Sequence, residues 1–391
     1  MTVDIEALYL KLPKNIMSFF GVWLPPKRHI ILHNIYMLII MVSQYSFLLF
    51  EFIYLFDVLD DLEAASEASY LLFTQASLCY KTTVFLVNKR HLIELLELMR
   101  CEMFAPETEV HEKFLSLLAV RIPRLCLFFM TSALTTCTLW AMIPLFDNQG
   151  RRSFPFRIWM PVTPERSPQY QLGYLYQVAA IYISAFLFIA VDSVAVCMIM
   201  FGCAELDIIM DKVTKLQKVP LSAKLKHTER TELLDKNYKL FVDCIRHHQG
   251  VIEFMVKVEN NFHANIFFQL SGSVAIICIT GLRISIVSPD SVQFFSMCNY
   301  MVTMLSQLFL YCWCGHELTI RSEKLREVVY QCPWYQQGTR FKRLLWITME
   351  RMKKPIIFKA GHYIPLSRQT FIAILRSSYS YFAVLNQANS K

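Results

Sequence analysis

The sequence predicts an all-α membrane protein with seven transmembrane helices. Three observations support this fold class: the composition, a series of long apolar runs, and an alternation of basic residues between the connections. Of 391 residues, 55% are hydrophobic and only 18% are charged, against about 45–50% and about 25% in soluble domains. Pro is spread thinly and no Gly/Ser-rich linker occurs, so we expect residues 1–391 to form one domain. The net charge of +8 is not gathered into one basic tract, which favours a lipid bilayer over nucleic acid as the partner.

The apolar runs are long enough to cross a bilayer, which takes roughly 20 residues in a helix. Six runs are strongly apolar, and a seventh is weaker because it carries Arg368 and Arg376 among several Ser and Tyr. A soluble core could account for one or two such runs but not for six. The predicted spans are approximately 29–56, 69–88, 121–146, 173–204, 262–287, 292–314 and 362–386.

Lys and Arg alternate between the connections. The N-terminal segment and the connections after the second, fourth and sixth spans hold 30 of the 39 basic residues, while the connection after the first span holds none. Basic residues are retained on the cytoplasmic side of a membrane. We therefore expect a cytoplasmic N-terminus and an extracellular C-terminus, which is the reverse of the orientation of G-protein-coupled receptors.

The two long cytoplasmic connections, 205–261 and 315–361, carry apolar residues at helical spacing. The first is predicted to extend the fourth and fifth helices, with an interruption near Pro220. Residues 340–354 form a basic amphipathic helix with Phe341, Leu344, Leu345 and Thr348 on one face. Such a helix can lie on a membrane surface, but it leads directly into the last span, so we favour a packed intracellular helical anchor.

No enzyme motif is present: the sequence has no nucleophile elbow, phosphate loop or H-E-x-x-H. Cys312, Cys314 and His316 have metal-like spacing, but only Cys312 and His316 share a helix face. We therefore expect neither a metal site nor a cofactor. His247 and His248 are adjacent, so their side chains diverge, and solvated helix positions are expected for both.

Ionisable residues within spans are costly and point to function. Lys81 lies two turns from the cytoplasmic end of its helix and could extend its ammonium to the interface. Asp192 lies deep in the fourth span and needs a partner: a hydroxyl, the backbone or a cation. Arg376 lies midway along the last span.

The last predicted helix has a polar stripe. Arg376, Ser380, Val384 and Gln387 follow one another at spacings of four, four and three, which puts them on one face. A polar face suits a bundle interior or a water-filled path. A single apolar residue within the stripe, Val384, is what a constriction that gates by dewetting requires, and several subunits would be needed to close such a pore.

The C-terminal third resembles the insect odorant receptor family. The elements that carry the resemblance, in order along this chain, are Tyr311-Cys312, Gly315, Leu318, Ser322, Trp334-Tyr335, Lys354-Pro355, Ala360-Gly361, Phe371 and Ser378-Tyr379-Ser380-Tyr381-Phe382. The remaining chain is similar more loosely, in length, span spacing and Asp192. The family's co-receptor has a longer second intracellular connection than this chain, which indicates a ligand-tuning subunit.

The resemblance implies an odorant-binding subunit of a ligand-gated, non-selective cation channel. The channel would be a heterotetramer with the odorant receptor co-receptor, in the plasma membrane of olfactory neuron dendrites, with no G protein required for gating. By the same resemblance the last helix lines the pore, with Arg376, Ser380 and Gln387 on its wall. Val384 falls at the family's hydrophobic gate, and Ala388 falls at a second gate position where the co-receptor carries Leu.

The resemblance also implies a pocket for a small volatile organic ligand in the outer half of the bundle. Candidates carried over by helix position are Tyr70, Phe73, Thr74, Ser77, Ala133, Thr136, Trp140, Gln177, Ile181, Met297 and Tyr300. An aromatic, apolar lining with few polar groups suits such a ligand. Simple helix packing remains the alternative for each aromatic residue.

Two competing functions remain open at this point. A gustatory-type receptor channel would belong to the same superfamily but differs in the terminal motif. A membrane transporter usually has two related halves and helices broken at the midplane, and no internal repeat is found in this chain.

Overall fold

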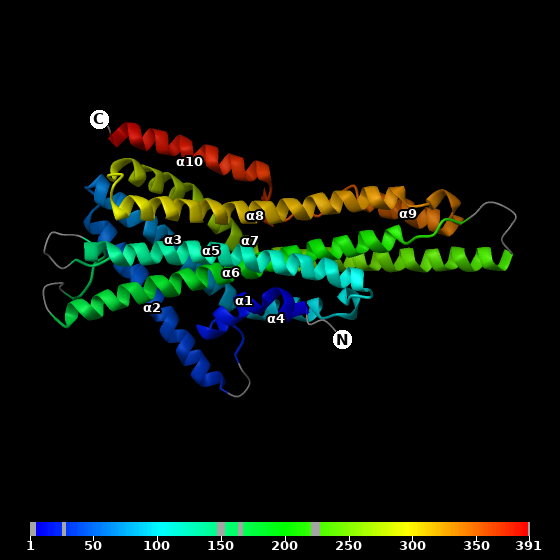
Figure 1. The fold of residues 1–391 in the computed structure, drawn as a ribbon, viewed down its shortest axis with the longest axis horizontal. Helices are drawn as coiled ribbons and strands as arrows, with labels where there is room; N and C mark the ends of the chain where they lie inside the picture. Colours follow the sequence, from blue (N-terminus) through cyan, green and yellow to red (C-terminus); the bar gives the residue numbers. More distant parts are fainter. Residues whose placement is uncertain (1–4, 26–28, 147–152, 163–166, 220–226, 390–391) are drawn as a thin grey trace.

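The computed structural model describes residues 5–25, 29–146, 153–162, 167–219 and 227–389. Within them the chain forms a bundle of long helices and one short two-stranded sheet (Figure 1). The elements are α1 Ile5–Phe19, α2 Ile30–Asp57, α3 Leu62–Val87, α4 Lys89–Met99, η1 Glu102–Phe104, α5 Glu109–Phe146, α6 Gln169–Thr214, α7 His227–Ile286, α8 Val292–Gln331, η2 Trp334–Gln336, α9 Thr339–Arg351, β1 Lys359–Ala360, β2 Ile364–Pro365 and α10 Arg368–Asn389.

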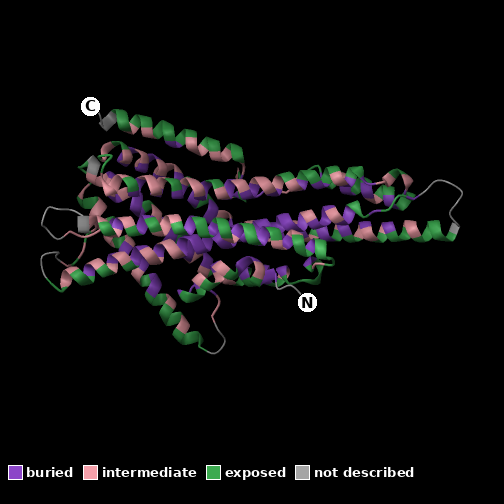
Figure 2. Ribbon diagram, in the orientation of Figure 1, coloured by how far each residue is buried: buried purple, intermediate pink, exposed green. Residues whose placement is uncertain are grey.

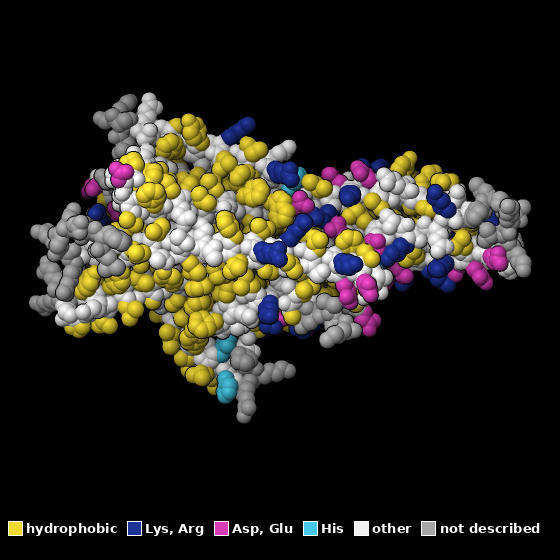
Figure 3. Space-filling view, in the orientation of Figure 1, with side chains coloured by type: hydrophobic (Ala, Val, Ile, Leu, Met, Phe, Trp, Pro, Cys, Tyr) yellow, Lys and Arg dark blue, Asp and Glu magenta, His cyan; other side chains and the backbone are white. Residues whose placement is uncertain are grey.

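The bundle has two ends of different character. At one end, here the loop end, lie the turn between α2 and α3, residues 153–162 and the turn between α7 and α8 (Figure 1). At the other, the anchor end, the long helices α6, α7 and α8 continue beside α9 (Figure 1). Apolar side chains cover the loop half of the surface in Figure 3, and charged side chains gather over the anchor half. That division suits one half embedded in lipid and the other in water.

Helix α6 forms the centre of the bundle. Every residue from Leu187 to Leu206 is buried, and the helix is purple along most of its length in Figure 2. A helix that is hydrophobic on all sides is buried, either among other helices or in lipid. Helices α1, α3, α5, α7 and α8 all pack against it.

Four described helices, α2, α5, α6 and α7, are long and apolar enough to cross a membrane by length and composition alone. Helices α3 and α8, which contain two of the six strongly apolar runs predicted as spans, do not reach this measure of hydropathy. Helix α3 carries Gln75, Ser77 and Lys81 on its buried side, and α8 continues beyond Cys314 into a charged half. Polar residues satisfied inside the bundle lower the hydropathy of these helices.

The anchor end is packed through apolar faces. In α9, Phe341, Leu345 and Thr348 are buried, and the helix contacts α7 and α8. Helix α6 ends at Thr214 and α7 begins at His227, while Pro220, the predicted interruption, lies outside the described residues. The expectation for the adjacent histidines was wrong: His247 is 3% and His248 is 5% exposed.

Burial of the histidine pair has a structural reason. His247 Nε2 lies 2.9 Å from Glu205 Oε2 of α6, so a polar contact compensates for its removal from water. The two side chains do diverge, but α7 is surrounded by packed helices at this level. Adjacency in the sequence therefore does not predict exposure here.

Helix α10 begins at Arg368 rather than at His362. Residues 359–365 form the β1–β2 hairpin, in which Gly361 and His362 adopt positive φ angles of 60° and 64°. Positive φ angles are incompatible with a right-handed helix. The hairpin is held against α7, because Gly361 N donates to His263 O at 3.0 Å. From there α10 runs along the outside of the bundle, next to α7 and α8 (Figure 1).

The two faces of α10 differ. Phe371 packs edge-on against Phe309 of α8, and Phe382 lies opposite Gly281 of α7. The predicted polar stripe of Arg376, Ser380, Val384 and Gln387 is exposed, and Val384 is 63% exposed. The stripe therefore faces away from the subunit's own bundle. The side chain of Ala388 lies outside the described residues.

Candidate functional site: a cavity between α3, α5, α6 and α8

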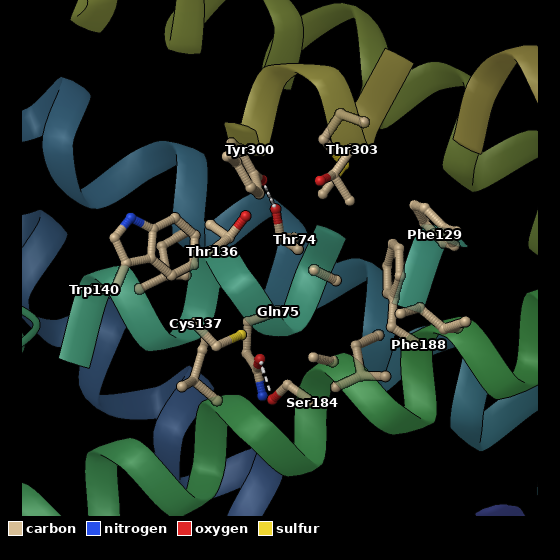
Figure 4. A pocket seen from close by; sticks show the side chains of 17 residues that line it. Thr74, Gln75, Phe129, Thr136, Cys137, Trp140, Ser184, Phe188, Tyr300 and Thr303 are labelled. Atoms are coloured by element: carbon tan, nitrogen blue, oxygen red, sulfur yellow. Dashed lines mark hydrogen bonds between the residues drawn. The ribbon is translucent and has the colours of Figure 1, made fainter. Parts of the chain in front are cut away.

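A cavity of about 60 Å³ lies in the loop half of the bundle (Figure 4). Helix α3 supplies Leu71, Thr74, Gln75 and Leu78; α5 supplies Phe129, Ala133, Thr136, Cys137 and Trp140; α6 supplies Ile181, Ser184, Ala185, Phe188 and Ile189; α8 supplies Tyr300, Thr303 and Met304. A dry apolar cavity that binds benzene in another protein measures about 150 Å³. An organic ligand therefore requires the side chains around this cavity to move apart.

Three aromatic rings close the cavity toward the loop end. The ring centroids of Trp140 and Tyr300 are 5.3 Å apart, and Tyr70 lies 5.7 Å from Tyr300 and 6.0 Å from Trp140. Such spacings are typical of attractive aromatic pairs. Phe156, from the segment before α6, meets Trp140 edge-on at 5.6 Å. The aromatic cluster separates the cavity from the space beyond it.

The polar groups of the wall bond to one another. Tyr300 and Thr74 are joined through their hydroxyls, as Figure 4 shows. Ser184 Oγ donates to Gln75 Oε1 at 2.9 Å. These bonds engage polar groups of the wall with one another, so the cavity has a mainly apolar interior, in which shape and dispersion dominate selection. A ligand oxygen would compete for the Tyr300–Thr74 pair.

Six of the eleven predicted ligand residues line this cavity: Thr74, Ala133, Thr136, Trp140, Ile181 and Tyr300. The other five lie elsewhere. Tyr70 and Met297 face a second chamber on the far side of the aromatic cluster. Phe73 precedes Thr74 by one residue, which places it about 100° around the helix. Its side chain is 42% exposed on the outer face of α3.

Ser77 and Gln177 have structural bonds outside the cavity. Ser77 Oγ donates to Gln269 Oε1 of α7 at 3.1 Å. Gln177 is fully buried and binds both backbone groups of Phe156: Nε2 donates to the carbonyl at 3.2 Å, and Oε1 accepts from the amide at 3.0 Å. Gln177 thus positions the segment before α6.

The sequence prediction missed several lining residues. Leu71 and Leu78 lie three and four residues from Thr74, and Gln75 lies four and three residues from those two, so helical spacing could have found all three. Ser184 and Phe188 lie three and seven residues after Ile181, so the same spacing could have found them, whereas Ile189 lies in the stretch of α6 that is buried on all sides and gives no such signal.

A buried ion pair adjoins the cavity. Lys81 Nζ lies 2.8 and 3.0 Å from the two carboxylate oxygens of Asp192, and Lys81 is completely buried. The expectation that Lys81 reaches the interface was therefore wrong, and the partner of Asp192 is a cation. The Lys81 ammonium also lies 4.0 Å from the ring centroid of Phe188, a cavity residue.

The ion pair connects four helices. Gln307 Nε2 of α8 donates to the Asp192 carboxylate. Gln269 Nε2 of α7 donates to Gln307 Oε1 at 3.0 Å. Polar bonds thus run from α3 and α6 at the cavity to α7 and α8, the two helices on which α10 rests.

The family model for the seven-transmembrane odorant receptors, described as "7tm Odorant receptor", matches residues 61–379. The chain belongs to the insect odorant receptor family. Odorant receptor Or1 of Anopheles gambiae is 26% identical over 96% of this chain and 94% of its own length. Odorant receptor 46a, isoform A, of Drosophila melanogaster is 25% identical over the full length of both chains.

The solved structure of the olfactory receptor OR5 from Machilis hrabei in complex with eugenol has the same fold. Its TM-score is 0.83 at 14% identity, with 99% of this chain and 100% of that chain covered. The family and fold matches confirm the predicted all-α membrane protein with seven transmembrane helices. This odorant receptor is a membrane-spanning receptor rather than an enzyme, and neither the gustatory-type nor the transporter alternative gains support.

Proposed function

We propose that this odorant receptor is the odorant-binding subunit of a heteromeric, ligand-gated, non-selective cation channel. Its partner is the odorant receptor co-receptor in a heterotetramer, and gating requires no G protein. The ligand is a small volatile organic molecule held in the cavity between α3, α5, α6 and α8. One observation carries the ligand side of this proposal: the cavity is aromatic and mainly apolar, and the Tyr300–Thr74 hydroxyl pair offers a polar contact in its wall.

The pore side of the proposal rests on α10. Arg376, Ser380, Val384 and Gln387 are exposed on a face turned away from the subunit's own bundle, and such a face on a membrane helix needs neighbouring subunits around a central path. Val384 then forms a narrow apolar ring that stops ions, because they cannot keep their hydration water there.

Coupling between the two sites follows the buried ion pair. A ligand that enlarges the cavity displaces Phe188, whose ring touches Lys81. Lys81, Asp192, Gln307 and Gln269 link that movement to α8 and α7. A ligand shifts the gate only by contacting the open arrangement better than the closed one, so expansion of the cavity is the expected feature of the open state.

The sidedness of the proposal comes from the basic residues of the anchor half, which place the N-terminus in the cytoplasm and the C-terminus outside. The receptor is assigned to the plasma membrane of olfactory neuron dendrites. Epitope tags at the two ends test the orientation: in unpermeabilised cells only the C-terminal tag should bind antibody. Binding at the N-terminal tag would contradict it.

The direct test of function is current in cells that express this receptor with and without the co-receptor, across a panel of volatiles. In cells that also express the co-receptor, we expect a cation current evoked by a volatile, and this current should persist when a G-protein inhibitor is added. A response that requires G-protein signalling, or no current with any volatile despite surface expression, would contradict the proposal.

A further inference from the structure

A second chamber lies between the aromatic cluster and the loop end. Its volume is about 420 Å³, and Leu71 and Trp140 form a wall that it shares with the odorant cavity. The other lining residues come from α2, α3, α5, α8 and the segment before α6: Glu51, Glu67, Ala68, Tyr70, Ile143, Pro144, Ser153, Phe154, Pro155, Phe156, Arg157, Ile158, Gln293 and Met297. This chamber is both larger and more polar than the odorant cavity.

Glu51 is the unusual group of this chamber. It lies on α2, six residues before the helix ends at Asp57, and is 2% exposed. Neither of its carboxylate oxygens has a hydrogen-bond partner among the described residues. A buried carboxylate without a partner is costly, and native structures retain one where it serves a ligand or an ion.

Glu67, the other acidic residue of the chamber, is paired with two arginines. Glu67 Oε2 lies 3.5 Å from a guanidinium nitrogen of Arg157 and 3.5 Å from one of Arg283. Glu51 takes part in no ion pair among the described residues. The two acidic side chains of the chamber therefore differ: Glu67 is held by two guanidinium groups, whereas Glu51 lines the chamber without an ionic partner among the described residues.

The chamber walls also suit a cation with an aromatic group. Tyr70, Trp140 and Phe156 form one side, where the ring centroid of Trp140 lies 6.0 Å from that of Tyr70 and 5.6 Å from that of Phe156. Aromatic faces attract ammonium groups and stack on aryl groups. The indole nitrogen of Trp140, which has no partner among the described residues, lies on the side of its ring away from the other labelled cavity residues in Figure 4.

We propose that the chamber is a second ligand site, which binds a primary arylalkylammonium ion with Glu51 as its counter-ion. The ammonium donates to the Glu51 carboxylate, and the aryl group packs on Tyr70, Trp140 and Phe156. The site is distinct from the odorant cavity and does not depend on the channel proposal. Through the shared wall of Leu71 and Trp140, its occupant also contacts the residues that close the odorant cavity.

Binding to the purified full-length receptor in lipid nanodiscs tests this site without any channel readout. The probe is phenethylamine, and 2-phenylethanol serves as the uncharged molecule of nearly equal size. We expect the amine to bind about tenfold more tightly than the alcohol, since charge-assisted hydrogen bonds are the stronger ones. In Glu51→Gln the affinity for the amine should fall about tenfold, while that for the alcohol stays unchanged.

Asp57→Asn is the matched control, because Asp57 is an exposed acidic residue on the same helix. It should leave the affinity for phenethylamine unchanged. If wild-type receptor binds the amine no more tightly than the alcohol, Glu51 is not a counter-ion for the amine and the proposal is overturned. The proposal also fails if Glu51→Gln retains wild-type affinity for the amine, or if Asp57→Asn lowers it equally. Should Glu51→Gln not fold, the wild-type comparison of amine and alcohol still decides.

Discussion

Helices α6 and α10 belong to the same subunit but have opposite surroundings. Every residue of α6 from Leu187 to Leu206 is buried by other helices of this chain. Among the described side chains of α10 only Ser378 is buried, and the helix lies along the outside of the bundle (Figure 2). Within one subunit, other helices therefore bury α6, whereas most of α10 stays exposed.

The difference in burial indicates that residues around α6 determine stability and that residues on α10 determine gating. Residues around α6 hold the bundle together and shape the cavity, so changes there should affect folding and ligand response. Residues on the exposed stripe of α10 have few contacts within the subunit, so changes there should alter permeation with little cost to folding. Each prediction below tests one side of this division.

The largest effect is expected at the ion pair on α6. Asp192→Ala leaves the buried Lys81 ammonium uncompensated, which should destabilise the receptor by about 3–5 kcal/mol. The expected result is loss of surface expression and a lower Tm in detergent. The double variant Lys81→Met with Asp192→Leu removes both charges and should recover much of the loss.

The matched variant on α10 is Arg376→Gln, at an exposed ionisable residue. It should lower the free energy of unfolding by less than about 1 kcal/mol, as for most surface substitutions, and Tm should therefore change little. Equal losses of Tm in Asp192→Ala and Arg376→Gln would contradict the division between the two helices.

A smaller effect is expected at the cavity wall. Trp140→Ala and Tyr300→Ala each remove aromatic and apolar contacts worth about 1–3 kcal/mol, which corresponds to a roughly 5- to 150-fold higher half-maximal odorant concentration. Dose–response curves with matched surface expression measure it. Phe73→Ala is the control, since that ring is exposed on the outer face of α3. Wild-type curves for both Trp140→Ala and Tyr300→Ala would show that the ligand binds elsewhere.

The joint between α8 and α10 should respond to a single methyl group. A Cβ at Gly315 would lie 2.8 Å from the carbonyl oxygen of Leu366, just before α10. Overpacking of this kind costs about 1–3 kcal/mol, so Gly315→Ala should shift the base of α10 and reduce the maximal odorant-evoked current. Gly272→Ala, where nothing lies within 4 Å of the added Cβ, should retain the wild-type current. Equal maximal currents in the two variants would show that the contact between Gly315 and Leu366 does not affect gating.

The sequence predicted the elements better than their orientations. The seven spans follow from hydropathy and charge, and Trp140 and Tyr300 were placed at the cavity by helix position. Ile189 could not be predicted, since which face of a fully buried stretch of helix meets a cavity depends on the packing of all its neighbours. The partner of Lys81 could not be predicted, because Asp192 lies 111 residues away in the sequence and no local pattern joins them. For α10 the stripe itself was visible, because its spacing repeats along one helix.

The exposed face of α10 carries the central claim, that this helix lines a pore gated at Val384. The decisive measurement is the resting current and ion selectivity of the receptor with its co-receptor, compared between Val384→Thr and Leu385→Thr. Val384 is 63% exposed on the stripe, while Leu385 is half-buried. The account predicts that Val384→Thr wets the narrow ring and raises the current without odorant, diluted by the co-receptor subunits, whereas Leu385→Thr leaves permeation unchanged. Altered permeation in Leu385→Thr with none in Val384→Thr would contradict it.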